Sequence, residues 1–151
     1  MRVWTFLHIL SMFLSVTASL GGDWLLLIAI RRRDLEAMRA ARSVWGSVEA
    51  FGFTTLFLGI AFGLIAAVVS DLDLTQGWLV AAYVLVGSGI LLGLAFGPYH
   101  KRLVAALDAS DGDRPSPELS VLLASPRPRV ATALSSLFLV LIVADMVLKP
   151  F

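Results

Sequence analysis

Residues 78–96 read WLVAAYVLVGSGILLGLAF and contain no charged side chain. A helix needs about 20 mostly apolar residues to cross about 30 Å of hydrocarbon. Three further stretches meet this requirement, at about residues 3–30, 48–69 and 130–147. These runs are too long for strands. We therefore predict an all-α protein, an integral membrane four-helix bundle that forms one transmembrane domain over residues 1–151.

The composition of the chain agrees with lipid as its main solvent. Hydrophobic residues make up 58% of the 151 residues and charged residues 15%, whereas soluble domains average about 45–50% and about 25%. A soluble protein of this length could not cover its surface with so few polar side chains. Cysteine is absent, which excludes disulfides, thiolate metal sites and cysteine nucleophiles.

Basic residues gather in two of the three loops that join the spans. The first basic loop contains Arg31, Arg32, Arg33, Arg39 and Arg42, and the second contains Lys101, Arg102, Arg114, Arg127 and Arg129. The third loop carries Asp71 and Asp73. The positive-inside rule therefore predicts two cytoplasmic loops and both termini on the outer side. We expect lipid headgroups to contact Arg31, Arg32, Arg33, Lys101 and Arg102.

The basic loops carry local structure signals. Residues 31–47 (RRRDLEAMRAARSVWGS) have a helix-forming composition and predict a helical extension of the flanking spans. Ser116 before Pro117 favours a helix start and predicts a short helical turn over residues 119–123. Residues 108–117 (DASDGDRPSP) lack the spacing of a calcium loop, and we predict a solvated turn there.

The first span combines a long apolar run with one polar face. The run resumes after Asp23 and reaches Ile30, which is too long for a signal peptide, so we expect an uncleaved span. At 100° per residue, a stripe of its polar side chains falls within about 60° of His8. They are His8, Ser11, Ser15, Ser19 and Asp23. Lipid would leave these groups unsatisfied, so the stripe is expected to face the bundle interior or a partner.

Depth estimates group the intramembrane polar residues into two clusters. His8, Tyr83 and Asp145 can meet near the outer surface. An inner cluster can form around Asp23 from the hydroxyls of Thr54, Thr55, Thr132, Ser135 and Ser136. Both clusters can be interhelical hydrogen bonds that fix the packing, a ligand pocket, or part of a proton path along the serine stripe.

Small residues form two ridges in the membrane. Gly59 and Gly63 lie four residues apart in the second span, as do Gly89 and Gly93 in the third. Such ridges let helices approach closely. We expect them to pack within the bundle, with a face for another chain, including a second copy of this one, as the alternative.

The two histidines, His8 and His100, lie near opposite faces of the predicted membrane. They cannot ligate one haem from its two sides within a single subunit. A haem at His8 would need another axial ligand or a second copy of the chain. The sequence contains no phosphate loop, no histidine-rich metal motif and no carboxylate pair at a fixed spacing.

Short motifs of the first and third spans resemble a known group of proteins. They are Phe6–Leu7–His8–Ile9–Leu10, Gly21–Gly22, Trp24–Leu25–Leu26–Leu27, Gly77–Trp78–Leu79, Gly97–Pro98 and Leu103. The group consists of uncharacterised bacterial predicted integral membrane proteins, loosely related to CopD-like and HemJ-like small membrane proteins. In HemJ-like oxidases a first-span histidine, matched here by His8, works with a lysine early in the third span. Residues 79–82 read LVAA, which argues against that oxidase activity.

These observations lead to three hypotheses. The first is a non-catalytic accessory subunit of a larger respiratory or photosynthetic complex in the bacterial plasma (inner) membrane. The second is a membrane protein that binds haem or a small ligand through His8, and the third is a small transporter or proton conductor. We expect membrane lipid and other membrane subunits as partners, no nucleic acid and, under the first hypothesis, no cofactor.

Overall fold

A computed structural model describes residues 2–110 and 114–149. Residues 111–113 of the predicted solvated turn lie outside this part of the chain. The described residues form five helices and no strand. The helices are α1 (Arg2–Arg32), α2 (Leu35–Val69), α3 (Gly77–Asp108), α4 (Pro117–Ala124) and α5 (Arg127–Leu148). Of these, α1, α2, α3 and α5 are long and apolar enough to cross a membrane, which confirms the predicted all-helical membrane fold.

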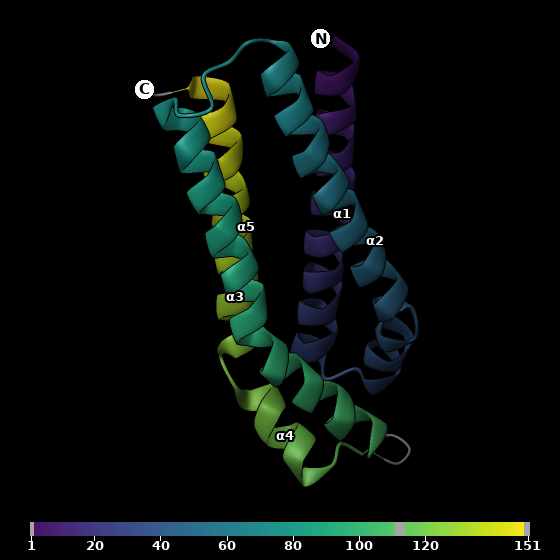
Figure 1. The fold of residues 1–151 in the computed structure, drawn as a ribbon. Coiled ribbons are helices and arrows are strands. Elements are labelled where there is room, and N and C mark those ends of the chain that lie inside the picture. Colours follow the sequence, from purple (N-terminus) through teal and green to yellow (C-terminus); the bar gives the residue numbers. More distant parts are fainter. Residues whose placement is uncertain (1, 111–113, 150–151) are drawn as a thin grey trace.

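The four long helices form two antiparallel pairs (Figure 1). α1 packs against α2 along most of its length, and α3 packs against α5. The contact between the two pairs is formed mainly by α1 and α5, whereas α2 and α3 contact each other little. The start of α1 and the end of α5 lie at the same end of the bundle in Figure 1, together with the connection from α2 to α3. We call this the terminal end, and we call the opposite end, with the α1–α2 turn, α4 and the start of α5, the basic end.

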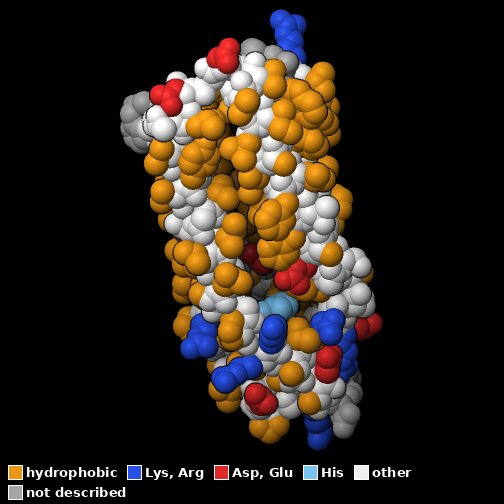
Figure 2. Space-filling model, in the orientation of Figure 1, with side chains coloured by type: hydrophobic (Ala, Val, Ile, Leu, Met, Phe, Trp, Pro, Cys, Tyr) orange, Lys and Arg blue, Asp and Glu red, His pale blue; other side chains and the backbone are white. Residues whose placement is uncertain are grey.

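Charge and exposure along the bundle follow the membrane pattern. In Figure 2 most of the visible lysine and arginine side chains gather at the basic end, and apolar side chains cover the long middle section. Large apolar side chains such as Leu91 (67% exposed) and Leu94 (68% exposed) point away from the protein. In water this exposure would be costly, whereas in lipid it is expected.

The turn between α1 and α2 is only two residues long. Arg33 adopts a left-handed conformation with φ of 53°, which reverses the chain direction after α1. The side chain of Asp34 then accepts a hydrogen bond from the backbone N–H of Ala37 (2.8 Å) and caps α2. The predicted helical extension over residues 31–47 is confirmed on both sides of this turn, since α1 ends at Arg32 and α2 begins at Leu35.

α3 extends further than the sequence predicts. The sequence pattern places the end of the third span at Gly97–Pro98, but the helix continues to Asp108 with Pro98 inside it. Proline has no N–H for the ladder and crowds the preceding turn, so it bends a helix without always ending it. In Figure 1 the lower part of α3 changes direction and runs under the α1–α2 pair.

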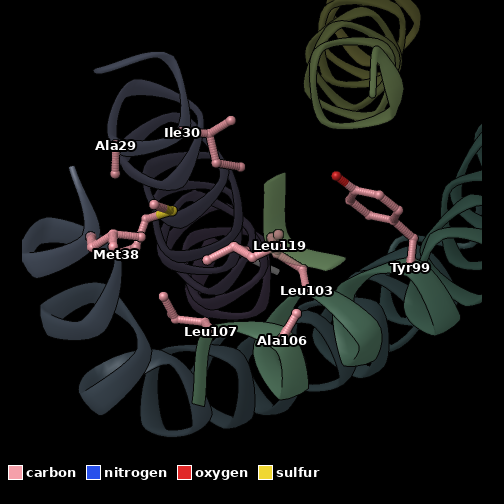
Figure 3. Packing of buried hydrophobic residues seen from close by; sticks show 9 residues of the cluster. Ala29, Ile30, Met38, Tyr99, Leu103, Ala106, Leu107 and Leu119 are labelled. Atoms are coloured by element: carbon pink, nitrogen blue, oxygen red, sulfur yellow. The ribbon is translucent and has the colours of Figure 1, made fainter. Parts of the chain in front are cut away.

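The best-packed hydrophobic core lies at the basic end (Figure 3). Met38 of α2 and Leu119 of α4 are its most completely buried side chains, and Leu103 of α3 joins them. α4 begins as predicted, because the Ser116 side chain accepts a hydrogen bond from the Leu119 backbone N–H (3.2 Å) next to Pro117. This core joins α1, α2, α3 and α4.

The connection at the terminal end contains a hydrogen-bonded turn. The Asp73 carboxylate accepts hydrogen bonds from the Thr75 hydroxyl (2.6 Å) and the Thr75 backbone N–H (2.9 Å). Both bonds favour the ionised form, the hydroxyl most strongly, and lower the pKa of Asp73. Because the folded-state pKa is lowered, the stabilisation is present at pH values above the unfolded pKa and is lost as the pH falls through the folded one.

Replacing Thr75 with valine should therefore raise the Asp73 pKa part of the way to its ordinary value. The hydroxyl bond is lost, whereas the backbone N–H bond remains. A pH titration of the Asp73 carboxyl carbon by NMR measures this change. The Thr75→Ser variant keeps both donors and should titrate like the wild type. An Asp73 pKa unchanged by Thr75→Val would show that the hydroxyl does not act on the carboxylate.

Candidate functional site

The polar stripe of α1 lies mostly against other helices. Ser11 and Ser15 are buried (8% and 5% exposed), His8 and Asp23 are half-buried, and Ser19 is exposed. Two of these side chains hydrogen-bond to backbone carbonyls of α2. The Ser15 hydroxyl donates to the Gly52 carbonyl oxygen (2.9 Å), and His8 Nδ1 lies 2.7 Å from the Gly59 carbonyl oxygen. Part of the stripe therefore holds α1 and α2 together.

Glycines of α2 make this close approach possible. A Cβ atom at Gly63 would lie 2.7 Å from His8 Nδ1, and one at Gly59 would lie 3.0 Å from the sulfur of Met12. Gly52, which is not part of the predicted ridge, would place a Cβ atom 3.2 Å from the Ser19 hydroxyl. Its position two helical turns before Gly59 is the signal that could have indicated it. The structure thus places the glycine ridge of α2 against α1.

The glycine ridge of α3 has no such neighbour. Cβ atoms built at Gly89 and Gly93 would meet no atom within 4 Å in the described chain. Gly89 nevertheless lies seven residues after Ala82 and fourteen before Leu103, which places the three on one face of α3, and Ala82 and Leu103 are buried (2% and 3% exposed). This face is therefore covered toward both ends of α3 and open between them. Figure 2 shows a crevice between the two helix pairs in this middle section.

The hydrogen bond of His8 assigns its tautomer. A carbonyl oxygen can only accept, so Nδ1 must carry the hydrogen that points to Gly59. In the neutral ring, Nε2 is then left with its lone pair. No second hydrogen bond of His8 occurs in the described chain. The arrangement matches that of metal-ligating histidines, which commonly donate their other N–H to a backbone carbonyl.

The residues of the predicted outer cluster are not joined by hydrogen bonds in the described chain. Tyr83 is 43% exposed, and His8 bonds to α2. Asp145 is only 7% exposed, and its Oδ2 is buried with no hydrogen-bond partner among the described residues. One turn further along α5, the ammonium of Lys149 lies 4.8 Å from the centre of the Trp78 ring.

Replacing Asp145 with leucine should stabilise the isolated protein by about 1–3 kcal/mol, because a buried polar atom without a partner costs about that much. The measurement is unfolding by sodium dodecyl sulfate in dodecylmaltoside micelles, followed by tryptophan fluorescence. Asp145→Asn keeps a polar group in place and should give a smaller gain. A loss of stability in Asp145→Leu would mean that the carboxylate has a stabilising partner within the chain.

Two hydroxyls of the predicted inner cluster form hydrogen bonds within their own helices. Thr55 donates to the Phe51 carbonyl oxygen (2.8 Å), and Ser136 donates to the Thr132 carbonyl oxygen (2.8 Å). No hydrogen bond in the described chain joins them to Asp23. The described residues also contain no group of three or more histidine, aspartate or glutamate side chains that could hold a metal ion.

The basic end brings together arginines from distant parts of the sequence. A polar pocket there is lined by Arg31 and Arg33, next to the α1–α2 turn, and by Arg129 in the first turn of α5. Arg32, Lys101 and Arg102 are exposed and do not line it. The sequence alone does not connect Arg129 with the first loop, because nothing in the local pattern indicates that these segments meet.

Two connected pairs of membrane-length helices and a charged end define an all-helical, multi-pass integral membrane protein. The chain belongs to the family described as "Predicted integral membrane protein (DUF2269)", which matches residues 2–150. The family's function is uncharacterised, which agrees with the resemblance to an uncharacterised membrane protein family. No curated protein and no solved structure matches the chain.

Proposed function

We propose that the protein is a non-catalytic accessory subunit that stabilises a larger complex of its membrane, with respiratory and photosynthetic complexes as the first candidates. The open glycine ridge of α3 carries this proposal. Gly89 and Gly93 form the kind of small-residue surface on which membrane helices dock. The corresponding surface on α2 is filled by α1, whereas the one on α3 is open. A helix or side chain of another subunit would fill it.

The test is native mass spectrometry of the tagged protein, extracted from its own membrane in a mild detergent. The wild type should be detected together with larger membrane subunits. Replacing both Gly89 and Gly93 with leucine should reduce this association at least tenfold, because overpacking costs about 1–3 kcal/mol at each packed site and about 1.4 kcal/mol is tenfold.

Gly21→Leu is the matched control, since Gly21 also has no atom within 4 Å of a built Cβ but lies on α1. It should leave the association unchanged. A wild-type protein that is a monodisperse monomer, and whose deletion disturbs no complex, would contradict the proposal. If the wild type is instead a homodimer that the α3 substitutions disrupt, the partner at the α3 ridge is a second copy of this chain and not another subunit.

A second candidate function is the binding of haem or another small ligand at His8. The hydrogen bond from Nδ1 to the Gly59 carbonyl favours it, because this bond orients the ring and leaves Nε2 able to ligate. Haem supplied to the apoprotein should then give a shifted absorption band that His8→Ala abolishes. The His100→Ala variant is the control and should retain the band. Binding that survives His8→Ala would end this candidate.

A further inference from the structure

The pocket at the basic end has three arginines and no acidic residue in its lining. Its volume is about 270 Å³. Its walls are the end of α1, the turn after it, the end of α4 and the first turn of α5. The lining residues are Leu27, Ile30, Arg31, Arg33, Leu123, Ala124, Ser125, Pro128 and Arg129.

The positive charge of this pocket is not compensated within the described chain. The one ion pair found there joins Arg42 and Asp108 (3.8 Å), and neither residue lines the pocket. Three guanidinium groups in one pocket repel one another unless an anion lies between them. Their planar donor sets match the oxygens of phosphate especially well. The pocket therefore has the charge and the donors of a phosphate site.

The start of α5 adds to this positive potential. The N-cap residue, Pro126, makes no side-chain capping hydrogen bond, and Pro128 has no backbone N–H to donate. The Ser125 hydroxyl accepts a hydrogen bond from the Arg127 backbone N–H (3.3 Å), but the first turn of α5 contains no acidic residue. The positive end of the helix dipole is therefore not neutralised by a charged side chain of this turn. Because Arg129 belongs to this first turn, its guanidinium and the helix dipole act on the same pocket.

Apolar residues also line the pocket, but Leu27 and Ile30 at the end of α1 offer little surface, since they are only 4% and 7% exposed. The adjoining spans do carry exposed apolar side chains, Ile28 of α1 (43% exposed) and Val130 of α5 (47% exposed). A lipid has acyl chains that can pack against this surface, whereas a freely diffusing anion has none. Basic pockets between membrane helices at the membrane surface are typical sites for anionic lipid headgroups.

We propose that this pocket binds the headgroup phosphate of one anionic phospholipid. Arg31, Arg33 and Arg129 bind the phosphate oxygens, and the exposed Ile28 and Val130 side chains of the adjoining spans contact the start of the acyl chains. The bound lipid joins the end of α1 to the start of α5 and so links the two helix pairs. This site is independent of the glycine ridge and of the accessory role, because it needs no other protein.

Native mass spectrometry of the purified protein, titrated with dioleoyl phosphatidylglycerol, tests the proposal. The wild type should retain one lipid after activation that removes phosphatidylcholine. The triple variant Arg31→Gln, Arg33→Gln, Arg129→Gln should lose at least tenfold in affinity, given about 1 kcal/mol for each basic residue near an anionic lipid surface. Arg114→Gln is the control, because Arg114 is an exposed arginine of the second basic loop that does not line the pocket and is not among the expected headgroup contacts.

Two results would overturn the proposal. The first is equal retention of phosphatidylglycerol by the wild type and the triple variant, or a loss in Arg114→Gln equal to that in the triple variant. The second concerns the source of the phosphate. If inorganic phosphate raises the thermal stability of the wild type but not of the triple variant, and phosphatidylglycerol does not, the site binds a soluble phosphate and the lipid assignment is wrong. Circular dichroism of each variant verifies that it remains helical.

Discussion

Replacing Gly59 and Gly63 together with leucine should destabilise the protein by about 3 kcal/mol or more. Overpacking at a single tight site typically costs about 1–3 kcal/mol. A Cβ atom at Gly63 would already lie 2.7 Å from His8 Nδ1, and one at Gly59 would lie 3.0 Å from the Met12 sulfur. The larger leucine side chains would force α1 away from α2 and break the His8 hydrogen bond to the Gly59 carbonyl.

Unfolding by sodium dodecyl sulfate in dodecylmaltoside micelles measures this loss. The pair Gly89→Leu and Gly93→Leu makes the same chemical change on α3, where a built Cβ meets no atom within 4 Å. It should cost less than about 1 kcal/mol in the isolated protein, as expected of substitutions away from packed sites. Similar losses of stability in the two double variants would mean that the glycine ridge of α3 is packed as tightly as that of α2.

Replacing Leu119 with alanine should cost about 3 kcal/mol. Its side chain is 0% exposed and packs in the core of the basic end with Met38 and Leu103. Truncating a buried leucine removes its transfer free energy and leaves a cavity, which together cost about 2–5 kcal/mol. The loss should weaken the docking of α4, because Leu119 is the one buried residue of that helix.

Val121→Ala on the same helix is the control, since Val121 is 73% exposed. It should change the stability little in the same detergent titration. Hydrogen exchange of the α4 amides should increase in Leu119→Ala and not in Val121→Ala. A Leu119→Ala variant with unchanged stability would mean that α4 is not packed as described. Because Leu123 and Ala124 of α4 line the arginine pocket, lipid retention should also decrease in Leu119→Ala.

The coarse fold can be predicted from the sequence because a single physical requirement largely determines it. Backbone groups in hydrocarbon must be hydrogen-bonded within the segment, so a long uncharged run is almost necessarily a helix. The helix α3 continues beyond the predicted third span for a local reason. Proline commonly ends a helix. The residues after Pro98, including Leu103 and Leu107, nevertheless form an apolar face that packs against α4 and α2. That packing favours continuation of the helix.

The partners of the polar side chains could not be predicted in the same way. Periodicity places His8 and Ser15 on one face, but their acceptors are the carbonyls of Gly59 and Gly52. Every residue has a carbonyl, so residue types do not indicate which one will be used. The packing of the two glycine ridges could not be predicted from the sequence either. Their sequence patterns are alike, and only the arrangement of the helix pairs leaves Gly93 open and Gly63 covered.

The bonds from His8 and Ser15 to α2 also determine how this molecule can deform. They are 2.7 and 2.9 Å long and lie about two helical turns apart. Sliding α1 by a single residue would shift it by about 1.5 Å along its axis and would break both bonds together. We therefore expect the α1–α2 pair to move as one rigid body. Any change in the width of the crevice between the two helix pairs (Figure 2) should then be a rotation of the α1–α2 pair against α3 and α5, with its pivot at the packed core of the basic end.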